Sequence, residues 1–449
     1  MKRVIKGVLK YSVVFIVTIL TLNLLLFLAC SFDSKVIEKK VKESADILHE
    51  QGMNPIISKA FNIEINNNTD SVVINIAYSI DSSNPLKSYL RARKNYKKGQ
   101  TKYQVGEMNG EGISINNDPE TGEDVTGGRY NPVGELYDFV NGNIENTMNY
   151  ARYWQGYLIL FRPLLIIFNL SQMRWFNIAS FLVLLLYFMY LLKKRFSLNV
   201  SIIYGLSIVC SGYFTAAYTL ESTPIFLTMM VASIIFLKRI DKIKQIGVFL
   251  FVVGCIANFV DFLTVPVITL GIPLSLYLLK LMEEKKDLKY CIKFLLSNSI
   301  LWLIAYGLTW LSKWVIYDLV LTNDSSLLKL GFEQVLYRTQ RVNEAVIAKS
   351  YVNSIIVMVG KSSLYALLTA FVIMCINKFK IVVSEFSKPT FAFLFLSLYP
   401  IVWYIVLANH TVLHEFFVYR HTLIYMVGVL LFINQLFEKK KEKKRKEEE

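Results

Sequence analysis

The thirteen residues Tyr157–Asn169, with the sequence YLILFRPLLIIFN, decide how this chain is placed relative to a membrane. They form an apolar run, but Arg162 and Pro163 stand in its middle. An arginine at the bilayer centre costs about 2.5–3.5 kcal/mol on insertion scales, and a proline removes a helical hydrogen bond. We therefore predict that residues 157–170 form an amphipathic helix on the outer membrane surface and do not span the bilayer.

The composition on either side of this run is that of a membrane protein. Of the 449 residues, 54% are hydrophobic, and the mean hydropathy is +0.42. Soluble chains contain about 45–50% apolar residues. The apolar residues gather into runs of roughly 18–25, the length that crosses a hydrocarbon core as helix. The net charge of +15 comes from clusters beside these runs and not from a basic, aromatic-rich soluble surface, so nucleic acid is not an expected partner.

Setting residues 157–170 aside leaves about ten apolar runs, which we predict to be spans. They lie near residues 10–30, 176–193, 200–218, 222–237, 245–262, 264–281, 290–312, 353–376, 390–407 and 416–436. Each inner loop then carries lysine or arginine, as the positive-inside rule requires. This layout places both termini in the cytoplasm and the large first loop outside, in a multi-pass protein of the cell membrane.

The predicted domains follow from this layout. A first span at 1–31 precedes an extracytoplasmic loop domain at 32–175, and a helical membrane domain occupies 176–437, with an outer loop at 315–352 and a charged cytoplasmic tail at 438–449. None of the five cysteines falls inside the first loop, so a disulfide-stapled outer domain is not expected. The predicted fold class is an all-α polytopic membrane protein whose α or α/β first loop carries interfacial helices.

Two carboxylates on the predicted outer side are candidates for chemistry. Asp70 precedes the strongly apolar stretch Ser71–Ile80, which we expect to pack on the domain or on the membrane. Asp261 lies in an apolar outer turn before Pro266 and needs a partner there. The alternative for each is structural, with Asp70 capping a helix and Asp261 accepting from backbone donors.

Cations and aromatic rings form two further candidate clusters on this side. Arg152, Tyr153 and Trp154 are suited to holding a lipid phosphate while rings stack on a sugar, although interfacial anchoring also explains them. Lys313, at the outer end of a span, and Arg338 and Arg341, in the loop beyond, are expected to form a cationic rim. Charges on a solvated loop are the alternative for the two arginines.

Three of the four histidines fall between residues 409 and 421. If this stretch enters the last span as helix, His414 and His421 share one face, with Arg420 turned roughly 100° away. His410 stands one turn before His414. The spacing is not the His-Glu-x-x-His arrangement of zinc proteases, so we favour a phosphate clamp over a metal site.

The chain resembles the GT-C superfamily of membrane glycosyltransferases, in which one span leads into a long outer loop with interfacial helices. Tyr153–Trp175 is similar to that interfacial segment, and Phe176–Phe196 to the span that follows it and ends in basic residues. More narrowly, Ala151–Tyr157, Asp261–Pro266 and His414–Arg420 are similar to segments of membrane proteins from surface-polysaccharide loci of Firmicutes.

The resemblance implies a bacterial enzyme that transfers a sugar from a polyprenyl-phosphate donor to a surface polysaccharide or glycolipid acceptor. In the superfamily the catalytic carboxylate follows the first span, often as an Asp-Glu or Asp-Asp pair. Here no such pair is present, and Asp33 stands alone near the membrane with Asp70 farther along. The expected base is Asp70 or, failing that, Asp33, while Arg152, Arg420 and Lys313 stabilise the leaving phosphate.

Two other functions remain open from the sequence. A surface-polysaccharide polymerase would also use an outer site rich in arginine and histidine, but its large loop often lies between later spans. A flippase or transporter would place polar residues at mid-bilayer depth, and no internal repeat of the transporter kind is visible. No cofactor is identified with certainty, and a divalent cation is compatible with the transfer chemistry. Membrane lipids surround the chain in all three cases.

Overall fold

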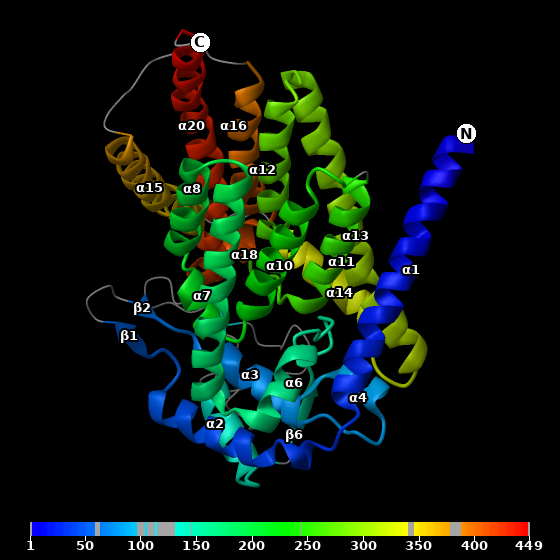
Figure 1. Cartoon of the computed structure of the whole chain (residues 1–449). Helices are drawn as coiled ribbons and strands as arrows, with labels where there is room; N and C mark the ends of the chain where they lie inside the picture. Colours follow the sequence, from blue (N-terminus) through cyan, green and yellow to red (C-terminus); the bar gives the residue numbers. More distant parts are fainter. Residues whose placement is uncertain are drawn as a thin grey trace.

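The computed structural model describes residues 2–58, 63–96, 104–105, 113–114, 131–144, 146–243, 245–339, 345–377 and 388–447. Long helices lie side by side in a bundle (Figure 1). The residues between α1 (Lys2–Cys30) and α7 (Leu170–Arg195) form a domain at one end of it, which we call the first-loop domain (Figure 1). The start of α1 and the end of α20 (Thr422–Glu447) both lie at the opposite end of the bundle.

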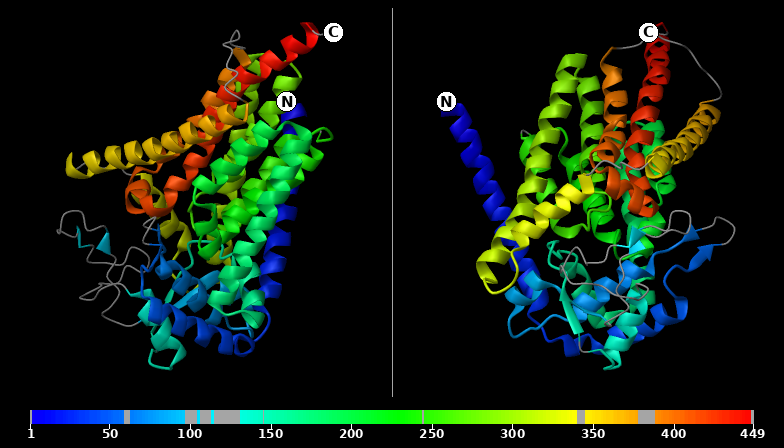
Figure 2. Two further views of the ribbon diagram at one scale, coloured as in Figure 1. Left: turned by 60° about the vertical axis from the view of Figure 1, so that its left-hand side comes forward. Right: turned by 180° about the vertical axis from the view of Figure 1, so that it is seen from behind.

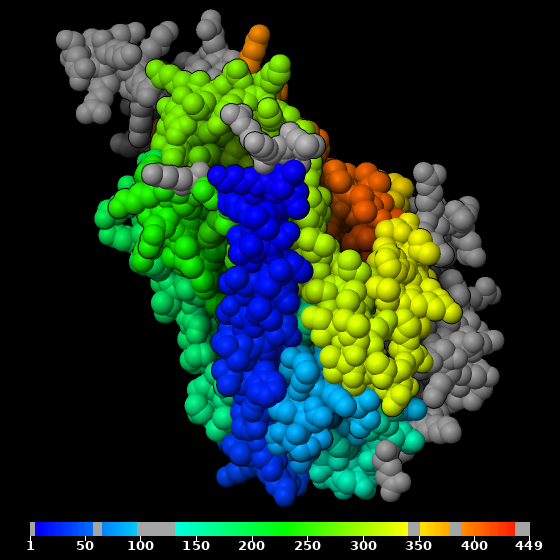
Figure 3. Space-filling model, turned by 90° about the vertical axis from the view of Figure 1, so that its right-hand side faces the viewer, coloured from blue at the N-terminus to red at the C-terminus, as the bar shows by residue number. Residues whose placement is uncertain are grey.

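The bundle is built from helices because its sequence is apolar over long stretches. After α7 its elements are α8 (Leu198–Cys210), α9 (Tyr213–Tyr218), α10 (Thr223–Arg239), α11 (Ile246–Val260), α12 (Ile268–Glu283), α13 (Leu288–Val320), α14 (Leu327–Thr339), α15 (Ala345–Ile376), the 3-10 turn η2 (Lys388–Thr390), α16 (Phe391–Ser397), α17 (Tyr399–Val406), α18 (Ala408–Leu413), α19 (Glu415–Val418), the 3-10 turn η3 (Tyr419–His421) and α20. Figure 2 shows α15 strongly tilted against the other long helices. Figure 3 shows α1 running along one side of the bundle to the first-loop domain.

Six helical segments among the described residues are long and apolar enough to cross a membrane. They are Ile5–Cys30, Leu170–Arg195, Leu288–Val320, Tyr351–Ile376, Lys388–Val406 and Glu415–Gln435. Large apolar side chains are exposed along α1, α7, α13 and α15, as on surfaces that contact lipid. The prediction of a helical membrane protein is therefore confirmed at this level.

The predicted count of about ten spans is not reached by length and composition alone. Helices α8, α10, α11 and α12 contain 13, 17, 15 and 16 residues. At 1.5 Å per residue these lengths are about 20–26 Å, short of a hydrocarbon core of about 30 Å. The run predicted as one span at 200–218 is divided at Ser211 and Gly212, between α8 and α9.

Three predicted boundaries also differ from the structure. The helix predicted at 157–170 is α6 (Leu158–Ile167), whose ten residues are too few for a span. The second span was expected from 176, but α7 begins at Leu170, because Asn169 and Gln172 form a capping box there. The predicted outer loop 315–352 is largely helical, since it contains the end of α13, all of α14 and the start of α15.

The first-loop domain is mainly helical, with three antiparallel pairs of short strands. Its elements are η1 (Ser34–Val36), α2 (Glu38–Gln51), β1 (Ile56–Ser58), β2 (Ile63–Glu64), α3 (Asn67–Tyr78), α4 (Pro85–Arg91), β3 (Arg93–Tyr96), β4 (Gln104–Val105), β5 (Ile113–Ser114), α5 (Pro132–Val140), β6 (Asn146–Asn149) and α6. The pairs are β1 with β2, β3 with β6, and β4 with β5. Helix α3 is buried on nearly all sides, so of the two placements expected for Ser71–Ile80, on the domain or on the membrane, the structure has the first.

Arg162, in the middle of α6, connects this helix to the end of α1. Its side chain is fully buried. Its guanidinium donates to the carbonyls of Ala29 (2.9 Å) and Phe32 (2.7 Å), to the carbonyl of Ala77, and to the Ser34 hydroxyl (3.3 Å). The carbonyls at the end of α1 lack helical partners, so Arg162 satisfies the end of that helix and joins it to α3.

A buried ion pair joins the first-loop domain to the bundle. Arg174 on α7 donates to an Asp70 carboxylate oxygen on α3 at 2.8 Å, and both side chains are at most 1% exposed. The other oxygen of Asp70 accepts from the backbone N–H of Leu220, at 2.7 Å. The terminal nitrogens of Arg174 also donate to Gln51 and Asn67, which helps to compensate for the burial of the pair.

We predict that Asp70→Asn destabilises the chain by about 3 kcal/mol or more, because removing one partner leaves the other charge buried. The measurement is the thermal unfolding of purified protein in detergent. Adding Arg174→Met should recover part of the lost stability. Glu38→Gln is the matched control, since the Glu38–Lys42 pair on α2 is exposed, and it should unfold like the unsubstituted chain. A melting temperature unchanged by Asp70→Asn would contradict the role of the pair.

Candidate functional site

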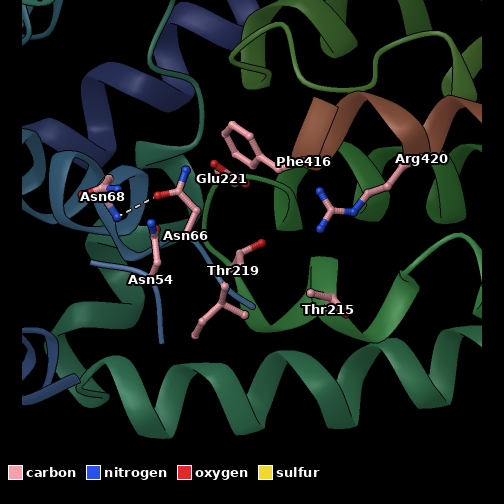
Figure 4. Close-up of a pocket in the computed structure, with 9 residues that line it drawn as sticks. Asn54, Asn66, Asn68, Thr215, Thr219, Glu221, Phe416 and Arg420 are labelled. Atoms are coloured by element: carbon pink, nitrogen blue, oxygen red, sulfur yellow. Dashed lines mark hydrogen bonds between the residues drawn. The ribbon is translucent and has the colours of Figure 1, made fainter. Parts of the chain in front are cut away.

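A pocket of about 290 Å³ opens between the first-loop domain and the bundle (Figure 4). This volume is near the lower end of the range of small-molecule sites. Both parts of the chain contribute to its walls, which are lined by Asn54, Ile65, Asn66, Asn68, Thr215, Thr219, Glu221, Phe416 and Arg420. The pocket combines amide, hydroxyl, carboxylate and guanidinium groups.

The first-loop side of the pocket is formed by the start of α3. Asn66 is the N-cap of this helix, and its side-chain oxygen accepts from the backbone N–H of Asn68 at 2.9 Å. The amide group of Asn66 also donates weakly to Thr69, at 3.4 Å. Capping of this kind fixes the end of a helix, so the asparagine side chains are held at the pocket wall.

The bundle side of the pocket depends on a glycine. Gly212, between α8 and α9, has φ +81°, a conformation that residues with a Cβ adopt at a cost. A Cβ there would lie 2.4 Å from the hydroxyl oxygen of Tyr419 and 3.5 Å from Nε of Arg420. The turn at Gly212 can therefore approach η3 closely, which places Thr215 and Thr219 beside Arg420.

Glu221 supplies the carboxylate of the pocket. It lies in the short connection between α9 and α10 and is 2% exposed. Burial raises the pKa of Glu221 to about 7, against the opposing effects of the positive charge of Arg420 and a hydrogen bond with Thr69. A carboxyl group with this pKa exchanges its proton near neutral pH, as a general base must.

Arg420 faces Glu221 and Asn66 across the pocket (Figure 4). It belongs to η3, is 3% exposed, and lies over the ring of Tyr419 at 5.2 Å. Its guanidinium donates to the Ser222 hydroxyl at 3.3 Å, and its Nε has no hydrogen-bond partner among the described residues. A buried guanidinium with an unused donor is suited to binding an anionic group.

The two predicted catalytic carboxylates are not in the pocket wall. Asp70 lies behind it, fully buried, with its oxygens directed to Arg174 and the Leu220 N–H. Burial raises the pKa of Asp70, while Arg174 opposes that rise. Asp33 is exposed beyond the end of α1, where it caps η1 by accepting from the Lys35 N–H at 2.9 Å. Neither carboxylate is placed to touch a molecule in the pocket.

The residues predicted around Tyr153 come together in a second polar cluster. The Tyr153 hydroxyl accepts from Arg338 at 2.9 Å, and its ring stacks on Trp310. The guanidinium of Arg152 lies 5.1 Å from the centre of the same ring. His410 contacts the other side of Arg338, with Nδ1 of the ring 2.9 Å from the guanidinium.

Asp261 is next to this cluster but is satisfied by its own loop. It accepts from the backbone N–H of Thr264 at 2.9 Å and from the Thr264 hydroxyl, and also from the N–H groups of Phe262 and Leu263. Burial raises its pKa to about 7. Its contacts are those of the structural alternative, in which the carboxylate holds the turn after α11.

The arrangement expected for the histidines is wrong. His414 and His421 do not share a helix face, because the helix breaks at His414 and again between Val418 and Thr422. His414 instead lies against His410, with ring centres 4.5 Å apart. His421 packs on Trp403 and interacts with the Val418 carbonyl through Nδ1 at 2.9 Å.

Lys313 and Trp154 form contacts between the first-loop domain and α13. Lys313 is fully buried and donates to the carbonyls of Leu90 (2.8 Å) and Tyr89 (3.3 Å) at the end of α4. Trp154 donates to the carbonyl of Thr309 at 2.7 Å and lies 5.4 Å from the Lys313 ammonium. Lys313 is therefore not part of an open cationic rim, and Arg341 lies outside the described residues.

Known proteins add no assignment to this geometry. Comparison with protein families, with curated proteins and with solved structures finds no match to the chain. Within the described ranges, no group of three histidine, cysteine, aspartate or glutamate side chains is arranged to hold a metal ion.

Of the pocket residues, Arg420 was predicted from the sequence, whereas Glu221 and the asparagines were not. Glu221 stands in Leu220-Glu221-Ser222-Thr223-Pro224, an acidic residue at the start of an apolar run and close to a proline. Asp261 was selected as a candidate because it has the same surroundings in the sequence, so Glu221 could have been selected in the same way. The asparagines carry no such signal, because asparagine is common in loops and helix caps.

We predict that the carboxyl groups of Glu221 and Asp261 lose their protons as the pH rises through about 7. Their C=O bands in infrared spectra should be present at pH 6 and absent at pH 8. Glu221→Gln should remove one band and Asp261→Asn the other, while Asp46→Asn, on the exposed face of α2, should remove neither. The folded chain holds the Glu221 proton more tightly than the unfolded chain. The free energy of unfolding should therefore decrease as the pH rises from about 4.5 to about 7. If the spectrum of Glu221→Gln at pH 6 kept both bands, Glu221 would not be one of the two protonated carboxyl groups.

Proposed function

We propose that the chain is a membrane glycosyltransferase that transfers a sugar from a polyprenyl-phosphate donor to a surface polysaccharide or glycolipid acceptor. The observation that carries the proposal is the pocket in which Glu221 faces Arg420. It pairs a carboxyl group that titrates near neutral pH with a buried cation that has a free donor. The resemblance to the GT-C superfamily favours the same reaction class.

The reaction follows from the placement of these two groups. Glu221, in its ionised form, takes the proton of an acceptor hydroxyl as the oxygen attacks the anomeric carbon of the donor sugar. The bond from that carbon to the phosphate oxygen breaks, and the lipid phosphate leaves with the electron pair. Arg420 stabilises the charge that develops on this phosphate. The asparagines on the opposite wall offer donors and acceptors to sugar hydroxyls.

This assignment replaces the base expected from the sequence. Asp70 retains a role in the proposal because it accepts from the Leu220 N–H, next to Glu221, and so connects α3 to the opposite wall of the pocket. Arg152 and Lys313, expected at the leaving phosphate, are not among the pocket residues. No step of the reaction requires a metal ion, and a divalent cation bound with the donor is compatible with it.

We also propose that the bundle crosses the membrane about ten times, with the first-loop domain outside and both termini in the cytoplasm. The start of α1 and the end of α20 lie at the same end of the bundle, opposite the first-loop domain, which supports this orientation (Figure 1). Helices α10, α11 and α12 are shorter than the hydrocarbon core, but most of their side chains are buried in the bundle. Polar backbone at their ends is then covered by protein, which a membrane tolerates.

Transfer is tested with purified protein in nanodiscs, a labelled polyprenyl-phosphate sugar and an acceptor glycan. We expect formation of a new glycosidic bond, a loss of about 100-fold or more in kcat for Glu221→Gln, and activity in the unsubstituted chain that falls below about pH 7. Asp46→Asn, an exposed carboxylate on α2 outside the pocket, is the matched control and should keep the activity of the unsubstituted chain. A chain that moves the lipid-linked sugar across the membrane without forming the bond would be a flippase, and one that joins repeat units would be a polymerase.

The orientation is tested by cysteine labelling in intact cells. A membrane-impermeant reagent should label Asn141→Cys, after α5 in the first-loop domain, and should not label Lys289→Cys, at the start of α13. Both positions are exposed. The unsubstituted chain measures the background from Cys375, which is also exposed. Labelling of position 289 from outside, or protection of position 141, would reverse the proposed orientation.

A further inference from the structure

Arg338, near the end of α14, is a second guanidinium that is almost fully buried. Only 7% of the surface of Arg338 is exposed to solvent. One terminal nitrogen lies 2.9 Å from Nδ1 of His410, and the other donates to the Tyr153 hydroxyl at 2.9 Å. None of these three residues lines the pocket of Glu221 and Arg420.

Both partners of Arg338 are neutral. A guanidinium can only donate, so Nδ1 of His410 accepts and carries no proton. Nε2 of the same ring lies 2.9 Å from the carbonyl oxygen of Leu263, to which it donates. His410 therefore carries a single proton, and burial, the largest cause, lowers its pKa well below the ordinary value.

Among the described residues, no carboxylate forms an ion pair with Arg338. Asp261 is close in the fold, but its oxygens accept from its own loop. Glu415 accepts from the Ser354 hydroxyl at 2.7 Å, on the side of α15. A buried guanidinium that has no carboxylate partner and keeps an unused donor is suited to binding an anion.

Two nitrogens in the cluster have no hydrogen-bond partner in the described structure. They are Nε of Arg338 and Nδ1 of His414, both of which are buried. His414 is the neighbour of His410, with ring centres 4.5 Å apart, and it is close enough to interact electrostatically with both Arg338 and Arg152. The unused donors and the positive potential therefore occur at the same place.

We propose that Arg338 and His414 bind a phosphate group at a site separate from the pocket of Glu221 and Arg420. Nε–H of Arg338 and Nδ1–H of His414 donate to its oxygens. A phosphate monoester, with a charge of about −1.5 to −2, suits the potential of two neighbouring guanidinium groups better than a carboxylate does. The site requires no sugar transfer, so it stands or falls independently of the proposed function.

The phosphate can be a lipid headgroup or a group carried by a water-borne molecule. Helix α14 exposes the apolar side chains Phe332 and Leu336, as a helix at a membrane surface does. A headgroup phosphate would then lie at the level of Arg338. The experiment therefore contains one arm for each source.

Binding is measured by calorimetry on full-length Arg420→Gln protein in phosphatidylcholine nanodiscs, titrated with inorganic phosphate. The Arg420→Gln background removes the guanidinium of the pocket and leaves the proposed site intact. We expect this chain to bind phosphate, and the further change Arg338→Gln to weaken the affinity at least tenfold, as for loss of a charged hydrogen bond. Lys329→Gln, an exposed lysine on the same helix, is the matched control and should bind as the background chain does.

Thermal unfolding with and without phosphate separates lost binding from lost folding. Phosphate should raise the melting temperature of the Arg420→Gln chain and not that of the chain that also carries Arg338→Gln. If the latter fails to fold, His414→Phe removes Nδ1, retains a ring against Phe417, and should weaken binding at least tenfold. An Arg420→Gln chain that binds no phosphate, or variants that bind it as well as their background, would overturn the proposal.

Nanodiscs that contain phosphatidic acid distinguish the two sources. Weaker binding of inorganic phosphate in these nanodiscs identifies a lipid headgroup as the competing ligand. Unchanged binding identifies a water-borne phosphate group as the ligand. Both results retain the site, because each requires phosphate binding that depends on Arg338.

Discussion

The pair formed by Asp70 and Arg174 is the interaction on which the arrangement of this protein depends. Each charge has left water, which is costly unless geometry and further hydrogen bonds compensate. They do so here, because Leu220 donates to Asp70, and because Gln51 and Asn67 accept from Arg174. One wall of the pocket lies at the start of α3, which carries Asp70, and the opposite wall includes Glu221, next to Leu220. The distance between the walls therefore depends on the contacts of Asp70.

The fold could be predicted from the sequence where a single local property decides the structure. The apolar runs are helical, because a segment of that kind can satisfy its backbone only internally, although several of these helices are short or divided. Arg162 and Pro163 identified an apolar run whose helix has only ten residues. The apolar stretch after Asp70 predicted packing on the domain or on the membrane, and it is buried within the domain as part of α3.

The placement of a side chain could not be predicted from the sequence where the residue that it contacts lies far along the chain. The helix that was expected to contain His414 and His421 is broken, and the partners that hold this segment include the Leu263 carbonyl, 147 residues from His410. Lys313 was placed on an open rim, but its partner Leu90 is 223 residues away. Hydropathy reports the preference of a segment for lipid or water, and it does not report such contacts.

The contacts of Arg162 also constrain the order in which the chain is assembled. Its guanidinium closes the end of α1 from 133 residues farther along. Chains are synthesised from the N-terminus, so the first helix enters the membrane long before this partner exists. Until α6 emerges, the carbonyls at that end have only water or transient partners, and α3 lacks its connection to them. Folding of the first-loop domain is therefore completed only after the last residues of the loop have left the ribosome.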